Sequence, residues 1–244
     1  SKKISVLAAG SWGTALANVL ADNHGNVTLW ARNEKQVEEI NSRHANERYL
    51  PGVQLSPHIR ATQTLSEAVK ESDAVVVVTP TTAVREVARQ IKPYLQPSCL
   101  LIHAAKGFEL GTMKRMSEVL AEELPDYDPS RIVVLSGPSH AEEVVRRSPT
   151  TVVVASKDPD AAKEAQDLFI NSYFRVYTNS DVTGVEVGGA LKNIIAIGAG
   201  LSDGLGFGDN AKAALLTRGL AEISRLGVAM GANPLTFAGL AGVG

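Results

Sequence analysis

The sequence is poor in the residues that mark several classes of protein. Cys99 is its only cysteine, so an intramolecular disulfide is excluded and a reducing compartment, the cytoplasm, is expected. The formal net charge is −2, with no block dense in lysine and arginine, so nucleic acid is not an expected partner. No apolar run is expected to span a membrane. Cys99 lies in the apolar run "SCLLIHAA", which predicts a packed thiol rather than a catalytic one.

Short β-branched runs alternate with helical patterns over most of the chain. These runs are apolar throughout, which predicts strands buried on both faces of a sheet. The expected strands are "KISVLAA", "NVTLWAR", "AVVVVTP", "CLLIHAA", "IVVLSG", "TTVVVAS" and "FRVYT". The helical patterns between them include "TALANVLADN", "EKQVEEINSRH", "TAVREVARQI" and "KRMSEVLAEEL". This alternation predicts an α/β fold with a Rossmann-type, doubly wound parallel sheet.

The pattern changes near residue 179. Beyond it the sequence predicts no strand, but two helices over residues 182–206 and 210–231, joined by a glycine-rich loop. We therefore expect a nucleotide-binding domain over residues 1–179 and an all-helical substrate domain over residues 180–244. The final residues, "FAGLAGVG", are small and apolar and stop abruptly. We expect the helical domain to be incomplete and the chain to belong to a longer polypeptide.

The first strand leads into the turn "AAGSWGTALA" and then into a helix. In such a turn, backbone N–H groups and the helix dipole can bind a pyrophosphate. Gly10 would let the backbone approach the phosphates, and Gly13 would let the helix pack closely on the strand. Ala8 stands where the G-x-G-x-x-G fingerprint has its first glycine, and its methyl group is tolerated if φ stays negative. A dinucleotide site is favoured over an ordinary strand–helix turn with two glycines.

The second strand ends in "LWARN", which bears on the choice of cofactor. NAD-specific folds usually carry an acidic residue about 20 residues past the fingerprint, where it binds the ribose 2′-hydroxyl. Ala31, Arg32 and Asn33 occupy that region here. The forked donors of Arg32 suit a 2′-phosphate, so NADP is favoured over NAD. The alternative is a solvated arginine at a strand end.

Two further motifs follow expected strands. "HAAKGFE" places Lys106 at a strand end, where ligands bind in open α/β sheets, so Lys106 is a candidate anion anchor or else a surface lysine. In "LSGPSHAEEV", Ser139 and Glu142 fit the capping box S-x-x-E, which predicts a structural role for both side chains. The N–H groups of Gly137, Ser139 and His140 remain available to a ligand. His140 has no partners at metal-ligand spacing, so neither metal binding nor catalysis is assigned to it.

Lys192 lies in the middle of the almost entirely apolar segment "GVEVGGALKNIIAIGAG". Deep packing of this helix would disfavour the charged form of the lysine and lower its pKa. An amine that is neutral near working pH suits a general base. Gly188, four residues earlier, is expected to clear one flank for a ligand. The alternative is a lysine whose stem is buried and whose amine reaches solvent.

Together these segments resemble bacterial NAD(P)-dependent glycerol-3-phosphate dehydrogenases. The resemblance covers the whole chain and is most specific over residues 184–227. It is carried by "AAGSWGTALA", "VVVTPT", "AAKGFE", "VVLSGPSHAEEV", "FRVYTN", "GVEVGGALKNIIAIGAGLSDGLGFGDNAKAALLTRGLAEISRLG" and "GLAGVG". It implies reversible hydride transfer between C2 of sn-glycerol 3-phosphate and NAD(P), with dihydroxyacetone phosphate as the ketone and no metal. The implied physiological role is to supply glycerol 3-phosphate for phospholipid synthesis.

The resemblance also implies roles for individual residues. Cofactor contacts fall in the turn of Gly10 and Gly13 and at Ser11, Trp12, Arg32, Lys106 and Ala141. Substrate contacts fall at Lys106, Gly137, Ser139 and Lys192, with Lys192 as the proton acceptor and Asn193 as a supporting residue. The sequence departs from the family at Ala8, where glycine is usual, and it stops before the family's aspartate and Arg-Asn substrate motif. As a chain of 244 residues it is expected to bind NADPH without measurable turnover.

Two alternatives stay open. One is another two-domain NADP enzyme, related to ketopantoate reductase or 6-phosphogluconate dehydrogenase. The other is a non-catalytic dinucleotide-binding regulator, against which a buried Lys192 argues. A homodimer is compatible with either enzyme.

Overall fold

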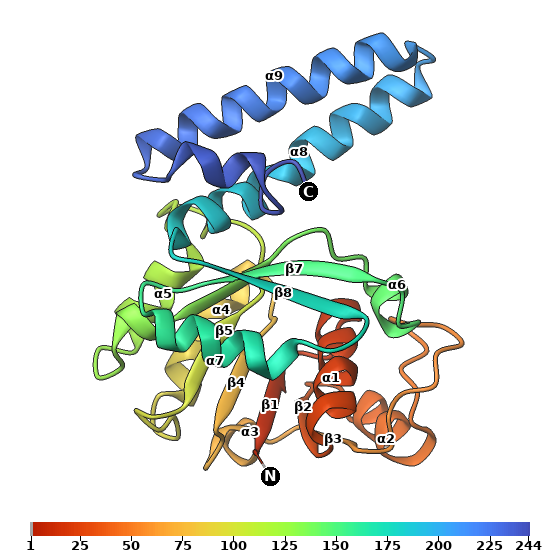
Figure 1. The fold of residues 1–244 in the computed structure, drawn as a ribbon. Coiled ribbons are helices and arrows are strands. Elements are labelled where there is room, and N and C mark those ends of the chain that lie inside the picture. The colour runs from red at the N-terminus through yellow and green to blue at the C-terminus, as the bar shows by residue number, and fades with distance from the viewer. Residues whose placement is uncertain (1) are drawn as a thin grey trace.

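The computed structural model describes residues 2–244 of the chain. Figure 1 shows a body built around a sheet, from which two long helices project. Within residues 2–244 the strands are β1 (Ile4–Leu7), β2 (Val27–Trp30), β3 (Ile59–Thr62), β4 (Ala74–Val77), β5 (Leu100–His103), β6 (Val133–Ser136), β7 (Thr150–Ala155) and β8 (Phe174–Asn179). The α-helices are α1 (Ser11–His24), α2 (Glu34–Arg43), α3 (Leu65–Val69), α4 (Thr81–Ile91), α5 (Met116–Glu123), α6 (Ala141–Val145), α7 (Pro159–Phe169), α8 (Val182–Gly204) and α9 (Gly208–Ala229). Two 3₁₀ helices complete the described elements, η1 (Pro129–Arg131) and η2 (Pro234–Ala238).

The strands form one sheet in the order β3-β2-β1-β4-β5-β6-β7-β8. This is the predicted Rossmann-type arrangement, with the strand order reversing at β1. Neighbouring strands are parallel except β6 and β7, which are antiparallel, so the prediction of a wholly parallel sheet is wrong at this pair. The connecting helix α6 has five residues and rises only about 8 Å, which is less than the length of β7. The chain therefore re-enters the sheet from the end at which β6 left it.

All seven expected strands are present, but β3 was not predicted. Its sequence, "IRAT", is interrupted by Arg60 and so contains no apolar run. β3 lies at the edge of the sheet, where Arg60 can face solvent. The buried neighbours Ile59 and Ala61 join the core beneath α1 and β2. β3 is therefore set by its pairing with β2 rather than by a local pattern.

The core lies on both faces of the sheet, as the apolar strands predicted. In β4, Val76 packs into the cluster beside α1 and α7, while Val75 and Val77 pack into the cluster beside α4 and α5. Cys99 belongs to the second cluster, and burial raises the pKa of its thiol to about 12. The thiol is therefore packed and unreactive, as expected.

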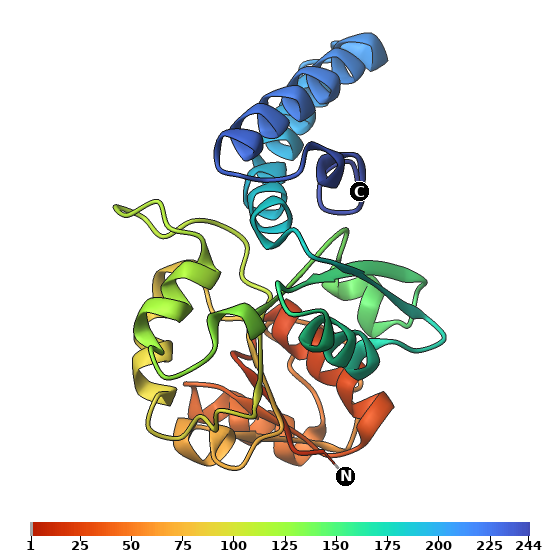
Figure 2. The same ribbon diagram turned by 60° about the vertical axis from the view of Figure 1, so that its left-hand side comes forward.

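Beyond β8 the described residues contain no strand, as predicted. α8 and α9 lie side by side in both views, with the last residues folded back against α8 (Figures 1 and 2). Residues 184–189 of α8 are buried, whereas Ile194, Ile197 and Leu201 expose 63%, 66% and 64% of their surface. The expectation of a deeply packed helix is correct for its first half and wrong for its second, which lies mainly against α9.

α8 is also long and apolar enough to cross a bilayer by length and composition, which the sequence analysis did not anticipate. Its first half, however, packs against the sheet and carries the buried carboxylate of Glu186 within an ionic network. These are the surroundings of a core helix in a folded domain rather than those of lipid.

Candidate functional site

The turn between β1 and α1 leaves the N-terminus of α1 open. Gly10 is the N-cap, and α1 has no side-chain cap and no acidic residue in its first turn. A Cβ on Gly10 would meet nothing within 4 Å, whereas one on Gly13 would lie 1.9 Å from the carbonyl oxygen of Ala8. The close packing assigned to Gly13 is confirmed. The free N–H groups and the space before Gly10 fit a bound anion.

Ala8 adopts a φ of +107°, so the condition under which its methyl group would be tolerated is not met. Its N–H donates to the carbonyl of Trp30 at 3.2 Å, and its own carbonyl packs against Gly13. These two contacts hold the residue in a backbone region that L-residues with a side chain rarely occupy. The turn therefore carries local strain at the position where the fingerprint has glycine.

Two buried donors near this turn have no partner. Trp12, the second residue of α1, packs on the core, and within residues 2–244 its indole Nε1 makes no hydrogen bond. The hydroxyl of Thr79, just beyond β4, is likewise buried and unpaired. Because β1 and β4 are adjacent and parallel, both donors lie at the carboxyl edge of the sheet. Unpaired buried donors are uncommon, and here they fit a polar ligand in the crevice. The Ser11 hydroxyl is instead engaged, donating to the carbonyl of Tyr49 at 3.0 Å.

Arg32 follows β2 at the same edge of the sheet. Its guanidinium carbon lies 5.8 Å from the centroid of the Trp30 ring. Among residues 2–244 its side chain makes no hydrogen bond or ion pair, so its donors remain free. Asn33 accepts a hydrogen bond from the N–H of Gln36 at 3.1 Å and caps α2. A stacked guanidinium with free donors is well suited to a phosphate.

Lys106, Gly137 and Ser139 come together, as predicted. Lys106 Nζ donates to the carbonyl of Gly137 at 3.3 Å and to the hydroxyl of Ser139 at 3.0 Å. Burial lowers the pKa of Lys106. Gly137 has a φ of +135°, and a Cβ there would lie 3.1 Å from the Cα of Val152, so this position requires glycine. The ends of β5 and β6 thus form one polar cluster.

The capping box predicted for Ser139 and Glu142 is wrong. α6 begins at Ala141, with His140 as its N-cap. Ser139 Oγ donates to the carbonyl of Gly137 at 3.2 Å, while Glu142 pairs with His140 Nδ1 at 2.9 Å on the surface. The hydroxyl of Ser139 therefore belongs to the cluster around Lys106. Ala141 is buried in the first turn of α6. Within the described part of the chain, no group of three or more potential metal ligands occurs, and His140 therefore belongs to none.

Lys192 is half-buried on α8. Burial, together with the nearby charge of Lys106, lowers its pKa to about 8, as the apolar surroundings predicted. Its Nζ donates to the carbonyls of Leu240 at 3.1 Å and Gly244 at 2.7 Å. Asn193 is exposed and shares with Lys192 a groove of about 300 Å³ between α8, α9 and residues 242–244. The charge of Lys106 thus acts on Lys192, although the two amines come from different parts of the fold.

The expectation that Gly188 clears a flank for a ligand is wrong. A Cβ at this position would lie 2.3 Å from the carbonyl oxygen of Ala241. The absence of a side chain instead lets residues 239–244 pack directly on α8. This packing puts the Leu240 carbonyl next to Lys192.

Sequence reasoning missed Glu186, whose side chain is only 4% exposed. Its carboxylate accepts hydrogen bonds from His103 Nε2 at 2.9 Å, Arg115 Nη1 at 2.8 Å and the N–H of Ser117 at 2.9 Å. The Ser117 hydroxyl donates to it as well. Burial acts to raise its pKa, but hydrogen bonds from His103 and Ser117 outweigh burial and lower it. The only signal in the sequence is one acidic residue within an apolar helix.

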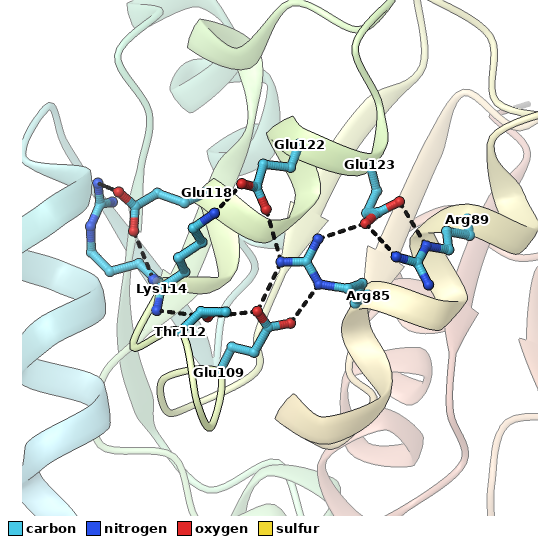
Figure 3. A network of polar contacts seen from close by, with 9 residues as sticks. Arg85, Arg89, Glu109, Thr112, Lys114, Glu118, Glu122 and Glu123 are labelled. Atoms are coloured by element: carbon cyan, nitrogen blue, oxygen red, sulfur yellow. Dashed lines mark hydrogen bonds and ion pairs between the residues drawn. The ribbon is translucent and has the colours of Figure 1, made fainter.

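A second polar network fixes the segment after Lys106 on the outside of the fold (Figure 3). Arg85 on α4 binds Glu109 through Nε at 2.7 Å and Nη2 at 2.8 Å. The same guanidinium reaches Glu122 at 2.8 Å and Glu123 at 2.6 Å on α5. This arginine therefore holds the β5–α5 connection against two helices.

Comparison with known proteins gives a consistent result. The family model described as NAD-dependent glycerol-3-phosphate dehydrogenase N-terminus matches residues 3–162, and the corresponding C-terminus model matches residues 181–244. The chain belongs to the NAD-dependent glycerol-3-phosphate dehydrogenase family. The resemblance noted in the sequence is thereby confirmed, and so is the fold class.

Individual members of this family are similar over the whole chain. A glycerol-3-phosphate dehydrogenase [NAD(P)+] from Bacillus velezensis is 57% identical over 243 residues, which cover 100% of this chain and 70% of that protein. One from Bacillus anthracis is 59% identical over 242 residues, covering 99% and 71%. The crystal structure of glycerol-3-phosphate dehydrogenase from Coxiella burnetii superimposes with a TM-score of 0.93 at 39% identity, covering 100% of this chain and 74% of that one.

Proposed function

We propose that the chain catalyses reversible hydride transfer between sn-glycerol 3-phosphate and dihydroxyacetone phosphate with NAD(P)(H). The observation that carries this proposal is the half-buried amine of Lys192, which lies within reach of the charge of Lys106. Lys192 has a pKa of about 8, lowered by burial and by the charge of Lys106. One site thus offers an amine that exchanges a proton near neutral pH beside a second cation that attracts an anion. The names of the Bacillus relatives support this activity.

The cofactor would be held at the carboxyl edge of the sheet. We assign its pyrophosphate to the turn of Gly10 and Gly13, where the first N–H groups of α1 are free. Arg32 would bind a 2′-phosphate, which favours NADP over NAD. The remaining proposed contacts are Ser11 through its backbone, Trp12, Lys106 and Ala141. When bound, the nicotinamide supplies or accepts the hydride at C2 of the substrate.

The substrate is a phosphate ester, and the cluster of Lys106, Gly137 and Ser139 would bind its polar groups. Lys106 and Ser139 both present hydrogen-bonding atoms at one place. Lys192 removes the proton of the C2 hydroxyl during oxidation and returns it to the C2 oxygen during reduction. The substrate must therefore displace the carbonyls of Leu240 or Gly244 from the amine. Asn193 borders the same groove and supports the orientation of the substrate.

The physiological proposal follows from the chemistry. Reduction of dihydroxyacetone phosphate would supply glycerol 3-phosphate for phospholipid synthesis. We place this activity in the cytoplasm, in keeping with the single buried thiol. The exposed apolar half of α8 is compatible with a homodimer. We also propose that residues 1–179 form the nucleotide-binding domain and residues 180–244 belong to the helical one.

A turnover assay tests the proposal. Oxidation of NADPH and of NADH is followed by absorbance after adding dihydroxyacetone phosphate or ketopantoate, and reduction of NADP+ is followed after adding 6-phosphogluconate. Turnover that depends on dihydroxyacetone phosphate supports the proposal. Turnover on ketopantoate would favour the alternative enzyme. Cofactor binding without turnover on any of these substrates, by a polypeptide that carries the family's Arg-Asn motif, would favour the non-catalytic regulator.

A further inference from the structure

Glu186 connects the structural elements that carry the two lysines of the site. It lies on α8, six residues before Lys192, while His103 is the last residue of β5, three residues before Lys106. The hydrogen bond between His103 and Glu186 at 2.9 Å therefore joins the two lysine-bearing elements directly. The side chains of His103 and Glu186 are 1% and 4% exposed, so solvent does not compete for this hydrogen bond.

The remaining partners of Glu186 come from the other end of the same connection. Arg115 and Ser117 flank the start of α5, where the chain that leaves β5 through Lys106 returns to the body. Arg115 Nη1 and the N–H of Ser117 donate to the carboxylate at 2.8 and 2.9 Å. Glu186 thereby fixes both ends of residues 103–117 onto α8. The Arg85 network in Figure 3 holds the outside of this connection through its ion pairs with Glu109, Glu122 and Glu123.

The direction of Glu186 sets the rotation of α8 about its axis. Six residues correspond to about 9 Å of rise and a side-chain direction about 120° away. Once the carboxylate is fixed on β5 and α5, the direction of Lys192 is fixed as well. Close packing adds to this constraint, since a Cβ on Gly189 would lie 2.7 Å from the Ser136 hydroxyl. An apolar residue at position 186 could fill the same space, but it would not select one rotation of the helix.

We propose that Glu186 is a positioning residue, whose carboxylate holds α8 in the rotation that brings Lys192 to Lys106. It does not contact substrate or cofactor and acts only through the helix. The effect on turnover rests on the proposed function, because it requires Lys192 to be the base. The effect on the position of Lys192 does not depend on that assignment.

The test uses Glu186→Gln, which keeps the shape of the side chain. It replaces one carboxylate oxygen, a hydrogen-bond acceptor, with an NH₂ donor, which then faces the donors of Arg115 and Ser117. Lys192 is followed by NMR after ¹³C-dimethylation of the lysines, with its signal assigned from Lys192→Arg. In a folded Glu186→Gln protein we expect the titration midpoint of Lys192 to rise by at least half a pH unit, as the helix moves away from Lys106. We expect kcat to fall at least tenfold, with cofactor Kd within twofold of the parent.

Glu118→Gln is the matched control. Glu118 also pairs with Arg115, at 3.4 Å, and accepts a hydrogen bond from the backbone N–H of that residue at 2.8 Å, but the Glu118 side chain is 46% exposed. This variant should keep kcat, cofactor affinity and the Lys192 midpoint unchanged. Ser117→Ala provides a milder change if Glu186→Gln does not fold, because it removes one hydroxyl donor and leaves the charged partners. It should shift the midpoint in the same direction by a smaller amount.

Two outcomes overturn the proposal. One is an unchanged Lys192 midpoint in folded Glu186→Gln, or in Ser117→Ala when the first variant does not fold. The other is an equal loss of kcat in Glu118→Gln. Failure of the proposed function is distinguishable, because it would appear as normal turnover in Lys192→Met while the midpoint still responds to Glu186.

Discussion

Replacing Ala8 with glycine is expected to stabilise the protein. Ala8 is held at a φ of +107° between its hydrogen bond to Trp30 and its contact with Gly13. A non-glycine residue in such a sparsely populated region costs about 1–3 kcal/mol. Glycine removes that cost, but it increases the entropy of the unfolded chain by about 0.4–1 kcal/mol. The net gain is about 1 kcal/mol, which raises the Tm by about 2–4 °C for a chain of this size.

The same substitution should tighten cofactor binding. If the turn relaxes in the free protein and loses part of its strain, that strain must be restored when the turn binds the pyrophosphate. If the whole net gain of about 1 kcal/mol appeared in binding, the Kd would fall roughly fivefold, since 1.4 kcal/mol corresponds to a tenfold change. The gain should be equal for NADPH and NADH, because the pyrophosphate is common to both.

Calorimetry and fluorescence titration of the variant with each cofactor measure these effects, with Ala9→Gly as the control. Ala9 is buried next to Ala8 but has no positive φ. Glycine there removes a buried methyl group and adds its entropic cost, so it should lower the Tm. The reasoning is refuted if Ala8→Gly lowers the Tm as Ala9→Gly does, because Ala8 would then not be strained. Unchanged cofactor affinity would mean that free and bound turns carry the same strain.

The remaining predictions concern the cofactor and the base. Arg32→Ala should weaken NADPH binding by about 1.5–3 kcal/mol and NADH binding little, since only NADPH has a phosphate for the guanidinium; equal losses in the two titrations would remove this role. Lys192→Met should retain cofactor binding but lower turnover by about a hundredfold or more, and near-normal kcat would contradict the assignment. Because the pKa of Lys192 is about 8, glycerol 3-phosphate oxidation, which needs the neutral amine, should rise as the pH increases through 8. Reduction, which needs the protonated amine, should fall over the same range, and pH profiles without this opposition would argue against Lys192.

Features that depend on neighbouring residues in the chain could be predicted from the sequence. The strands were recognisable from continuous apolar runs, and Gly13 from its place between a strand and a helix. The lowered pKa of Lys192 followed from the apolar residues around it. In each case the physical cause lies within a few residues of the effect.

Features set by distant contacts could not be predicted. Glu186 finds its partners 69 to 83 positions away, and nothing near it identifies them. The capping box failed because Lys106 and Gly137, on two strand ends, engage the Ser139 hydroxyl. Gly188 was misread because residues 239–244, rather than a ligand, occupy the space beside it. The β6–β7 pairing depended on how far the short α6 could carry the chain.

The half-buried state of α8 has a mechanical consequence. The helix is embedded up to Gly189 and projects beyond it, so any tilt has its pivot near Glu186. From that pivot, Lys192 is about 9 Å along the axis and Gly204 about 27 Å. A tilt of about 5° would move the far end of the helix by about 2 Å but the base by less than about 1 Å. The projecting half can thus follow thermal motion or an association partner while the amine stays close to its working position.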